Sequence, residues 1–315
     1  MRPAEAAGLA ERTLLLAVAG SRAQGLHRPD SDVDLRGVAV PTPAQLLGYR
    51  ETWSQDDDPD ALAPFAAQLP EAERRFAVGS RLEGTVYALA KFVRLAADAN
   101  PSILESLFCR DAEVRVCTPL GSRLRAARGA TLSLRAGETF SGYAVQQLKR
   151  IQGHRRWLTA PPAGPPERSA MGLPTRPVRS PGPDEAAAER RFAEATRTWQ
   201  QYRTWRERRN PHRAALEAAH GYDTKHGMHL VRLLRMGREI LETGEVHVWR
   251  GDRDAPELAA IREGAWPYDH LVAWAEAEAA AVRSLPSAAV PPEPDHETLD
   301  ALVVELHQRA LAGER

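Results

Sequence analysis

The sequence is poor in cysteine, with only Cys109 and Cys117 among its 315 residues. Two thiols cannot build a disulfide framework, and their spacing does not match a CxxC metal-binding knuckle. Free cysteine most often packs as a small apolar side chain, so we expect both thiols to be buried. The lack of a disulfide framework also favours a reducing compartment, which we expect to be the cytoplasm.

Long apolar runs are also missing, which argues against a transmembrane helix and against a membrane partner. The first twelve residues carry acids and lack the pattern of a signal peptide. The chain has no excess of either charge, because 42 Lys and Arg balance 42 Asp and Glu. A globally basic charge therefore gives no argument for nucleic-acid binding, although local basic patches remain compatible with it.

The N-terminal part of the sequence contains short apolar runs that indicate strands. Residues 13–19 (TLLLAVA) form a continuous apolar run, which is typical of a buried strand. Residues 33–40 alternate between apolar and polar side chains, which predicts a second strand. Residues 85–97 begin as a strand and continue with the spacing of an amphipathic helix.

The rest of the chain has mostly helical spacing. Helices are predicted at residues 102–108, 137–158, 186–209, 211–219, 222–243, 256–261, 267–285 and 296–312. Residues 245–248 are compatible with a short strand. In the helix at 137–158 we expect Tyr143, Leu148, Ile151 and Trp157 to be buried.

The composition divides the chain into two expected domains. Residues 1–125 carry the strand signals and residues 126–315 are mostly helical. At about residues 160–183 the helical part is interrupted by a stretch rich in Pro, Gly and Ser, which predicts a loop or linker.

Two short motifs follow the first predicted strand. Gly20 and Ser21 end that strand, and a glycine there lets the backbone approach a phosphate, which the serine hydroxyl and nearby N–H groups can bind. Asp32 and Asp34 are two apart at the second strand, so both carboxylates should point the same way. Two hard oxygen ligands on one rigid face suit Mg²⁺, which binds carboxylates together with substrate phosphate oxygens.

Each motif is common by itself, and a lone DxD usually forms a solvated turn or a helix cap. The ordered pattern of strand, GS, short helical stretch and SDxD is much longer, and it favours a function. Arg22, His27 and Ser31 lie inside this pattern. We therefore include all three among the candidate residues that bind the nucleotide phosphates or the acceptor.

Residues 20–38 (GSRAQGLHRPDSDVDLRGV) resemble the signature of the DNA polymerase β superfamily of nucleotidyltransferases. The resemblance is closer to one bacterial and phage family, the predicted nucleotidyltransferases associated with RNA ligase and RNA repair. The other similar blocks are YALAKFVRLAADANPSILESLF (87–108), FSGYAVQQLKRI (140–151) and GYDTKHGMHLVRLLRMGREILETGEV (221–246). The resemblance is weakest at residues 55–82 and 161–183, which look like insertions.

The resemblance implies an α+β fold, in which a polymerase β-like core with a small mixed sheet and flanking helices precedes a helical C-terminal domain. It also implies transfer of a nucleoside monophosphate from an NTP to an acceptor hydroxyl, with release of pyrophosphate, and Mg²⁺ as cofactor with Mn²⁺ as an alternative. The family association implies an RNA end or a tRNA as acceptor. Two other interpretations stay open: a protein hydroxyl as the acceptor, and a nucleotide- or RNA-binding module without turnover.

The superfamily usually completes its metal site with a third acid on a neighbouring strand. Glu83, Glu51 and the acidic cluster at residues 56–60 are the candidates. We favour Glu83, because it lies where the resemblance would place an aspartate and its oxygens can ligate the same metal. The alternative is a solvated acid at the end of a strand, and the acidic cluster is more typical of a surface loop.

A second set of candidates lies in the block YDTKHGMHLVRL. Tyr222, Lys225, His226, His229 and Arg232 follow spacings of three and four, which places them on one broad helical face. Cationic side chains can bind a triphosphate and a tyrosine can stack on a base. The alternative is a solvated basic face. Zinc is disfavoured, because no Cys ligand or HExxH motif accompanies the histidines.

Two further features of the helical part have a simpler interpretation. Asp223 lies at the start of the helix predicted at 222–243, in a position to cap its first turn. Residues 149–156 (KRIQGHRR) form a basic patch that ends at Trp157. Such a patch is either ordinary solvated surface or a track for a nucleic-acid backbone.

Overall fold

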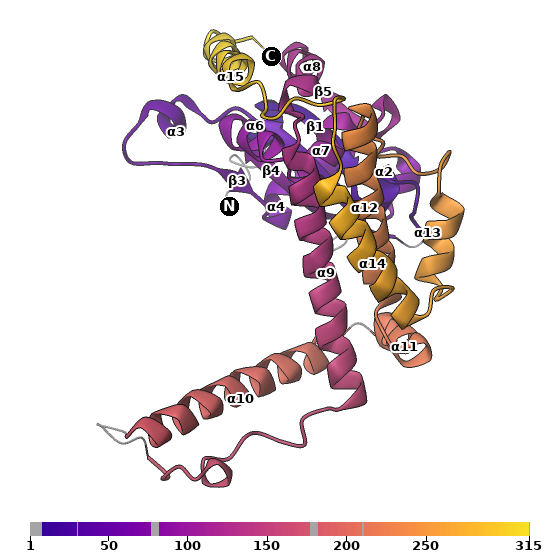
Figure 1. Cartoon of the computed structure of the whole chain (residues 1–315). Coiled ribbons are helices and arrows are strands. Elements are labelled where there is room, and N and C mark those ends of the chain that lie inside the picture. The colour runs from indigo at the N-terminus through magenta and orange to yellow at the C-terminus, as the bar shows by residue number, and fades with distance from the viewer. Residues whose placement is uncertain (1–7, 30, 77–81, 177–181, 210, 315) are drawn as a thin grey trace.

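A five-stranded mixed sheet forms the centre of the N-terminal part of the fold (Figure 1). The structure is a computed structural model that describes residues 8–29, 31–76, 82–176, 182–209 and 211–314, without the side chains of residues 212 and 213. The strands are β1 (Thr13–Ala19), β2 (Val33–Ala39), β3 (Gln55–Asp56), β4 (Leu82–Ala88) and β5 (Val114–Cys117). Their order is β3-β4-β2-β1-β5, with β2 and β4 parallel and the other pairs antiparallel.

Helices surround this sheet and make up the C-terminal part of the chain. Around the sheet are α2 (Gly20–Ala23), α3 (Pro43–Leu47), α4 (Pro59–Leu62), α5 (Glu71–Arg74), α6 (Leu89–Ala97), α7 (Pro101–Phe108) and α8 (Pro119–Ala126). The later helices are α9 (Arg135–Thr159), α10 (Pro183–Glu207), α11 (Pro211–His220), α12 (Thr224–Thr243), α13 (Ala255–Arg262), α14 (Tyr268–Ser284) and α15 (His296–Leu311). Short 3₁₀ turns are η1 (Ala63–Gln68), η3 (Asp111–Glu113), η4 (Arg128–Thr131) and η5 (Ser169–Met171). The α+β class is confirmed.

Strand β1 is apolar along its whole length because each of its faces meets a different hydrophobic core. All seven of its residues are buried. Leu15 lies in the main core with the large helices. Leu16 points to the other face of the sheet, into a smaller core that contains Leu62 and Phe65. A strand with no polar face is therefore what this central position requires.

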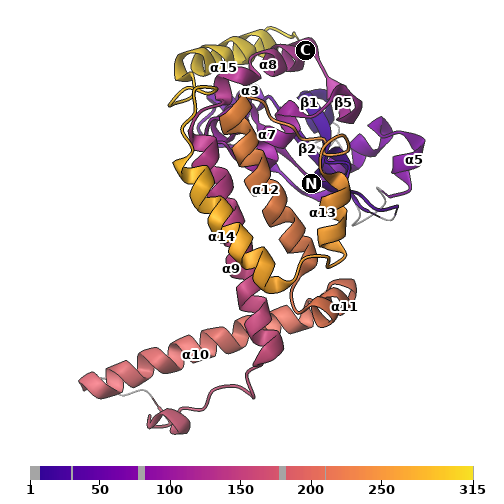
Figure 2. The ribbon, with the colours of Figure 1, turned by 45° about the vertical axis from the view of Figure 1, so that its right-hand side comes forward.

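Helices α9, α12 and α14 pack against one another and run side by side in both views (Figures 1 and 2). Gly237 allows the close approach of α12 to α9, since a Cβ there would lie 2.9 Å from the Cβ of Phe140. Asp223 caps α12 as expected, because its carboxylate accepts a hydrogen bond from the backbone N–H of His226 at 3.1 Å. The helix ends at Gly244, whose φ of 71° is left-handed.

Helix α10 forms a projecting arm whose C-terminal end lies at the foot of α9, with the segment that joins the two helices beside it (Figures 1 and 2). That segment is the predicted Pro- and Gly-rich loop. Residues 160–176 are irregular apart from η5, and residues 177–181 lie outside the described part of the chain. The helix after the loop begins at Pro183, three residues earlier than predicted.

The main core draws side chains from both expected domains. Leu104 and Phe92 from the first half pack in the same core as Leu230 and Leu306 from the second. The boundary between residues 125 and 126 stays a prediction. Within the described residues no helix is long and apolar enough to cross a membrane.

Four expectations about single segments and side chains were wrong. Trp157 is only half-buried, because it lies near the C-terminal end of α9. Residues 245–248 have no regular secondary structure, because they run from the end of α12 towards α13 without pairing to a strand of the described sheet. Tyr143 is 38% exposed, since it lies on the outer side of α9, where its hydroxyl meets Asn100. Cys117 is exposed at the end of an edge strand, whereas Cys109 is buried as expected.

The two thiols should therefore differ in reactivity. Burial raises the pKa of Cys109 to about 11, so only roughly one thiolate in 10³ forms there at pH 8. We expect a Cys117→Ser protein to react with Ellman's reagent at pH 8 about 100-fold more slowly than the wild type. Full reaction should return in denaturant. Equal rates for the two native proteins would contradict the placement of the thiols.

Candidate active site

A row of three residues crosses the sheet at the end where the two motifs meet. Ala19 at the end of β1 lies opposite Asp34 on β2, and Asp34 is in register with Glu83 on β4. Residues in register on neighbouring strands point to the same face, so the carboxyl groups of Asp34 and Glu83 share one face of the sheet. Asp32 lies two residues before Asp34 and is exposed. The sequence pattern and the sheet register thus bring these acids to one end of β2 and β4.

Gly20 lies directly against the carboxylate of Asp34. A Cβ at this position would be 2.2 Å from Oδ2 of Asp34, which is far inside van der Waals contact. The backbone of Gly20 also has a φ of 61°, in the left-handed region that favours glycine. Two independent constraints therefore require glycine at this position, which are the left-handed backbone and the close approach to Asp34.

Arg22 holds the turn that carries Asp32. Its guanidinium donates from Nη2 to the carbonyl of Ser31 at 2.6 Å and from Nε to the carbonyl of Asp32 at 3.1 Å. The hydroxyl of Ser31 in turn accepts a hydrogen bond from the backbone N–H of Arg28 at 2.8 Å. Arg22 and Ser31 thus make contacts that shape the turn, which the sequence alone did not indicate.

The groups around Asp34 shift the pKa of its carboxyl group in opposite directions. Burial raises the pKa of this carboxyl group, and the nearby Asp32 raises it further. The positive charges of Arg36, Lys225 and Arg22 lower it, in that order. Helix α12 therefore brings Lys225 within electrostatic reach of Asp34, although almost two hundred residues separate them in the sequence.

A cavity of about 380 Å³ opens beside the two carboxylates. It is lined by Asp34, Arg36, Asp57, Pro59, Leu82, Glu83, Gly84 and Thr85. Arg36 was missed in the sequence, although its position two residues after Asp34 on a strand places it on the same face. Its Nη1 donates to the carbonyl of Leu35, and its Nε is buried without a partner among the described residues. The loop with Asp57 forms the opposite wall.

His27 and Ser21 flank the same end of the sheet. Ser21 is half-buried, and its carbonyl accepts a hydrogen bond from the N–H of Leu26 that closes the loop after α2. His27 is exposed, and loss of hydration and the charge of Arg22 lower its pKa, against a smaller opposing effect of Glu73. A neutral imidazole at the surface can accept or donate a hydrogen bond but brings little charge.

The predicted basic face of α12 divides into separate environments. Lys225 and His229 are half-buried on the side towards the sheet. Desolvation lowers the pKa of His229 well below its usual range, helped by the charges of Arg232 and Lys225, so its imidazole is neutral. His226 is turned away, with Nδ1 3.0 Å from Oδ2 of Asp223, and lines a different cavity.

Tyr222 and Arg232 do not lie on an open face, and this corrects the interpretation of both as nucleotide-binding residues. Tyr222 is fully buried in the main core, where its hydroxyl donates to the carbonyl of Trp266 at 2.8 Å. Its ring has no free face for a base. Arg232 is 5% exposed and donates to the carboxylate of Glu105. Helical spacing gave the direction of these side chains but not the depth of the helix in the core.

Glu105 joins the loop after the GS motif to α12. Its second oxygen accepts a hydrogen bond from Nε2 of Gln24 at 2.7 Å, and all three side chains of the Gln24–Glu105–Arg232 chain are buried. The guanidinium of Arg262 donates to the carbonyl of Leu26 at 3.1 Å. The C-terminal helices therefore hold the GS loop in place, and no local sequence signal predicted these contacts.

Because Tyr222 is buried, we expect its substitution to change the stability of the fold and not the affinity for a nucleotide. Tyr222→Phe removes one hydrogen bond and leaves the ring in place, so it should destabilise the fold by about 1 kcal/mol. Denaturant unfolding would measure this change. Nucleotide affinity should stay the same, since the ring does not reach the carboxylates. A raised Kd for NTP without loss of stability would restore the stacking role.

The residues at this end of the sheet fit a hard divalent cation that is held jointly with a substrate. Among the described residues no group of three His, Cys, Asp or Glu could hold a metal by itself. Mg²⁺ typically uses only one or two protein carboxylates and takes its other ligands from phosphates and water. Asp34 and Glu83 supply two carboxylates on one face, and the backbone of Gly20 lies directly against that of Asp34. The donor set is all oxygen, as Mg²⁺ or Mn²⁺ prefers.

A mixed sheet with GS after one strand and two carboxylates on the next is the arrangement of a polymerase β-like nucleotidyltransferase. The family model of the RNA repair pathway DNA polymerase beta family matches residues 4–159. Through this N-terminal half, the chain belongs to that family, which confirms the resemblance seen in the sequence. The match ends at the last residue of α9. The searches of curated proteins and of solved structures gave no match.

Proposed function

We propose that this protein transfers a nucleoside monophosphate from an NTP to a hydroxyl at an RNA end, with release of pyrophosphate. The family supports nucleotidyltransferase chemistry and a connection with RNA repair. The observation that carries the proposal is the contact between Gly20 and Asp34. The absence of a side chain at Gly20 lets its backbone, whose N–H groups could face a phosphate, lie directly against a carboxylate that protein cations only partly neutralise.

Each residue of the site has a role in this proposal. Gly20 and Ser21 bind the β- and γ-phosphates through their backbone N–H groups and the serine hydroxyl. Asp32, Asp34 and Glu83 hold the divalent cation. Arg22 positions Asp32 through the two carbonyls that it binds.

When bound, the cation supplies charge neutralisation at the phosphates and lowers the pKa of an attacking hydroxyl. Lys225 adds a positive charge from α12 on the side of Asp34, where it can balance the triphosphate. The neutral His229 beside it is suited to donate or accept a hydrogen bond with the nucleotide or the acceptor.

A transfer assay tests the proposal. The purified protein is incubated with Mg²⁺ and each α-³²P-labelled NTP in turn, with and without total RNA. We expect label in RNA that is lost on ribonuclease treatment. Label that stays with protein and resists ribonuclease would replace the RNA acceptor with a protein hydroxyl. Nucleotide binding without any transfer would mean that the chain is a binding module.

A further inference from the structure

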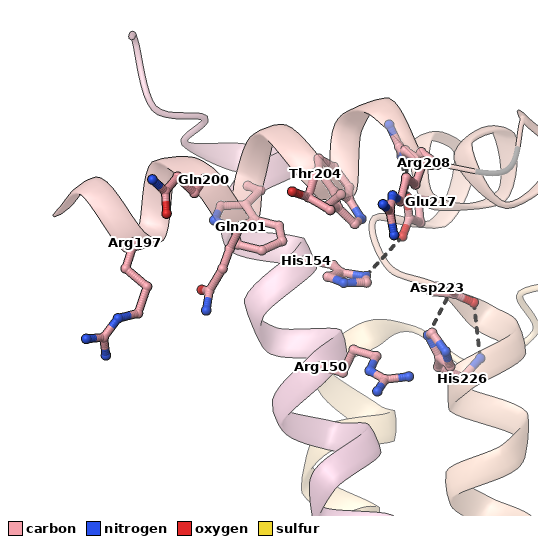
Figure 3. A pocket seen from close by; sticks show the side chains of 13 residues that line it. Arg150, His154, Arg197, Gln200, Gln201, Thr204, Arg208, Glu217, Asp223 and His226 are labelled. Atoms are coloured by element: carbon pink, nitrogen blue, oxygen red, sulfur yellow. Dashed lines mark hydrogen bonds and ion pairs between the residues drawn. The ribbon is translucent and has the colours of Figure 1, made fainter. Parts of the chain in front are cut away.

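A large cavity lies away from the carboxylates, between α9, α10, α11 and α12 (Figure 3). It measures about 980 Å³. Figure 3 shows Arg197 and Gln201 projecting from α10, and Arg150 from α9 towards His226 on α12. The cavity includes part of the basic patch at 149–156, but five of its thirteen lining residues come from α10, which lies beyond the family match.

The charge of this cavity is positive and incompletely balanced. Its wall carries four arginines against two carboxylates, Glu217 and Asp223. Glu217 is buried and accepts a hydrogen bond from Nε of Arg209 at 2.6 Å, while Asp223 pairs with His226. Both carboxylates therefore already have a partner side chain. The side chains of the other three arginines have no partner among the described residues and can neutralise a ligand.

These three arginines, Arg150, Arg197 and Arg208, are all exposed. Their guanidinium groups make no ion pair or hydrogen bond within the part of the chain that the structure describes. They lie on α9, on α10 and directly after α10, and they line one cavity, which distinguishes them from a charge run along one solvated face. Such unpaired guanidinium groups suit an anionic chain, since each can bind a phosphate oxygen pair.

Aromatic rings lie between these charges. The imidazole of His154 stacks on Trp157 with centroids 5.7 Å apart, and Trp157 lies 5.4 Å from Trp205 of α10. Both indoles line the cavity and are only half-buried. The indole N–H of Trp157 has no hydrogen-bond partner among the described residues. Half-exposed rings beside phosphate-binding cations are the combination that stacks unpaired bases.

We propose that this cavity binds single-stranded RNA. Arg150, Arg197 and Arg208 contact successive phosphates, and unpaired bases stack on Trp157 and Trp205. Side-chain amides and a hydroxyl in the same wall, such as Gln201 and Thr204, can bind base edges or the 2′-hydroxyl. A duplex fits less well, because paired bases cannot offer a face to the indoles. A metal does not fit, since both acids are paired and the described residues contain no metal-binding group.

The cavity and the carboxylates lie on two sides of the same helix. The first turn of α12 directs Lys225 towards Asp34 and the adjacent His226 into the cavity. RNA held in the cavity would thus lie next to the helix that borders the active site. This inference rests on the proposed function, because it states how the RNA acceptor is held.

The test measures RNA binding without chemistry. A fluorescein-labelled single-stranded RNA of mixed sequence is titrated with the full chain in EDTA, without NTP, and anisotropy is recorded at several salt concentrations. The variant is the triple Arg150→Ala, Arg197→Ala and Arg208→Ala. Loss of three phosphate contacts should flatten the slope of log K against log salt by about 0.7 per contact, about 2 in total, and should weaken binding about tenfold or more.

A matched triple controls for lost charge. Lys149→Ala, Arg190→Ala and Arg206→Ala remove three exposed cations from the same two helices, and none of them lines the cavity. The control should keep its affinity within about twofold and its salt slope nearly unchanged. Equal effects of the two triples would overturn the inference. So would wild-type protein that does not bind the RNA, which would leave the cavity to a protein partner.

The two proposals fail in different ways. If the cavity triple loses RNA binding while no transfer to RNA is found in any protein, the RNA site stands and the proposed reaction is wrong. If transfer to RNA is found and the cavity triple keeps both the wild-type KM for RNA and the salt slope, the reaction stands and this site is wrong. Quenching of tryptophan fluorescence by unlabelled RNA in the wild type supports stacking, and its absence counts against it.

Discussion

Asp34→Asn should reduce nucleotidyl transfer by at least about 10²- to 10³-fold, the effect of losing one preorganised electrostatic contact to a transition state. The change keeps the shape of the side chain and removes its charge. Asp34 lies in register with Glu83 and against Gly20, so a cation and a phosphate at this end of the sheet both depend on its carboxylate. Initial rates at saturating NTP and Mg²⁺ measure the effect.

The folded state should tolerate this substitution well. Burial already raises the pKa of Asp34, so the folded protein disfavours its charged form, and a neutral amide removes that cost. We therefore expect the melting temperature without metal to be unchanged or higher. Asp60→Asn is the control, because it removes an exposed carboxylate from the first turn of the nearby α4. Wild-type transfer by Asp34→Asn, in a protein that keeps its fold, would show that the cation is held elsewhere.

The sheet could be predicted from the sequence because its signals are local. A run such as TLLLAVA is uncommon outside a strand that is buried on both faces, and β1 is buried in this way. The alternation in residues 33–40 placed Asp34 on the face opposite to Val33 and Leu35, where the structure has it. The neighbourhood of Glu83 and Asp34 followed only from the resemblance, since no local pattern specifies which strands pair or in what register.

The environment of α12 could not be predicted, because it depends on contacts far apart in the chain. The spacing of Lys225, His229 and Arg232 is the same for a solvated face and for a face that meets Glu105 and Gln24. Tyr222 was expected to be exposed because helical spacing does not show which face of the helix other parts of the chain cover. The cavity beside α10 is a further case, since it forms only where α9 and α10 cross. Composition showed the basic patch but not the second helix that completes it.

Gly20→Ala should remove most of the activity, because the added methyl group displaces the atoms around Asp34. The new Cβ would lie 2.2 Å from Oδ2 of Asp34, so either the carboxylate or the backbone must move. The left-handed φ of 61° adds about 1–2 kcal/mol of strain. A displacement of about 1 Å at a reacting centre can lower the rate about 10²-fold, and we expect a loss of at least this size in kcat.

Gly172→Ala separates the two effects, because Gly172 has a φ of 71° but no atom within 4 Å of the position that a Cβ would take. Both variants should lose about 1–2 kcal/mol of stability from the backbone strain, as measured by denaturant unfolding. Only Gly20→Ala should lose transfer and nucleotide binding, because only there does the methyl group enter the space beside Asp34. If Gly20→Ala lost stability like its control but kept its kcat, the close contact with Asp34 would have no part in catalysis, and the phosphates would have to bind elsewhere. If it lost activity without loss of stability, the carboxylate rather than the backbone would have moved, and Asp34 would be the group through which Gly20 acts.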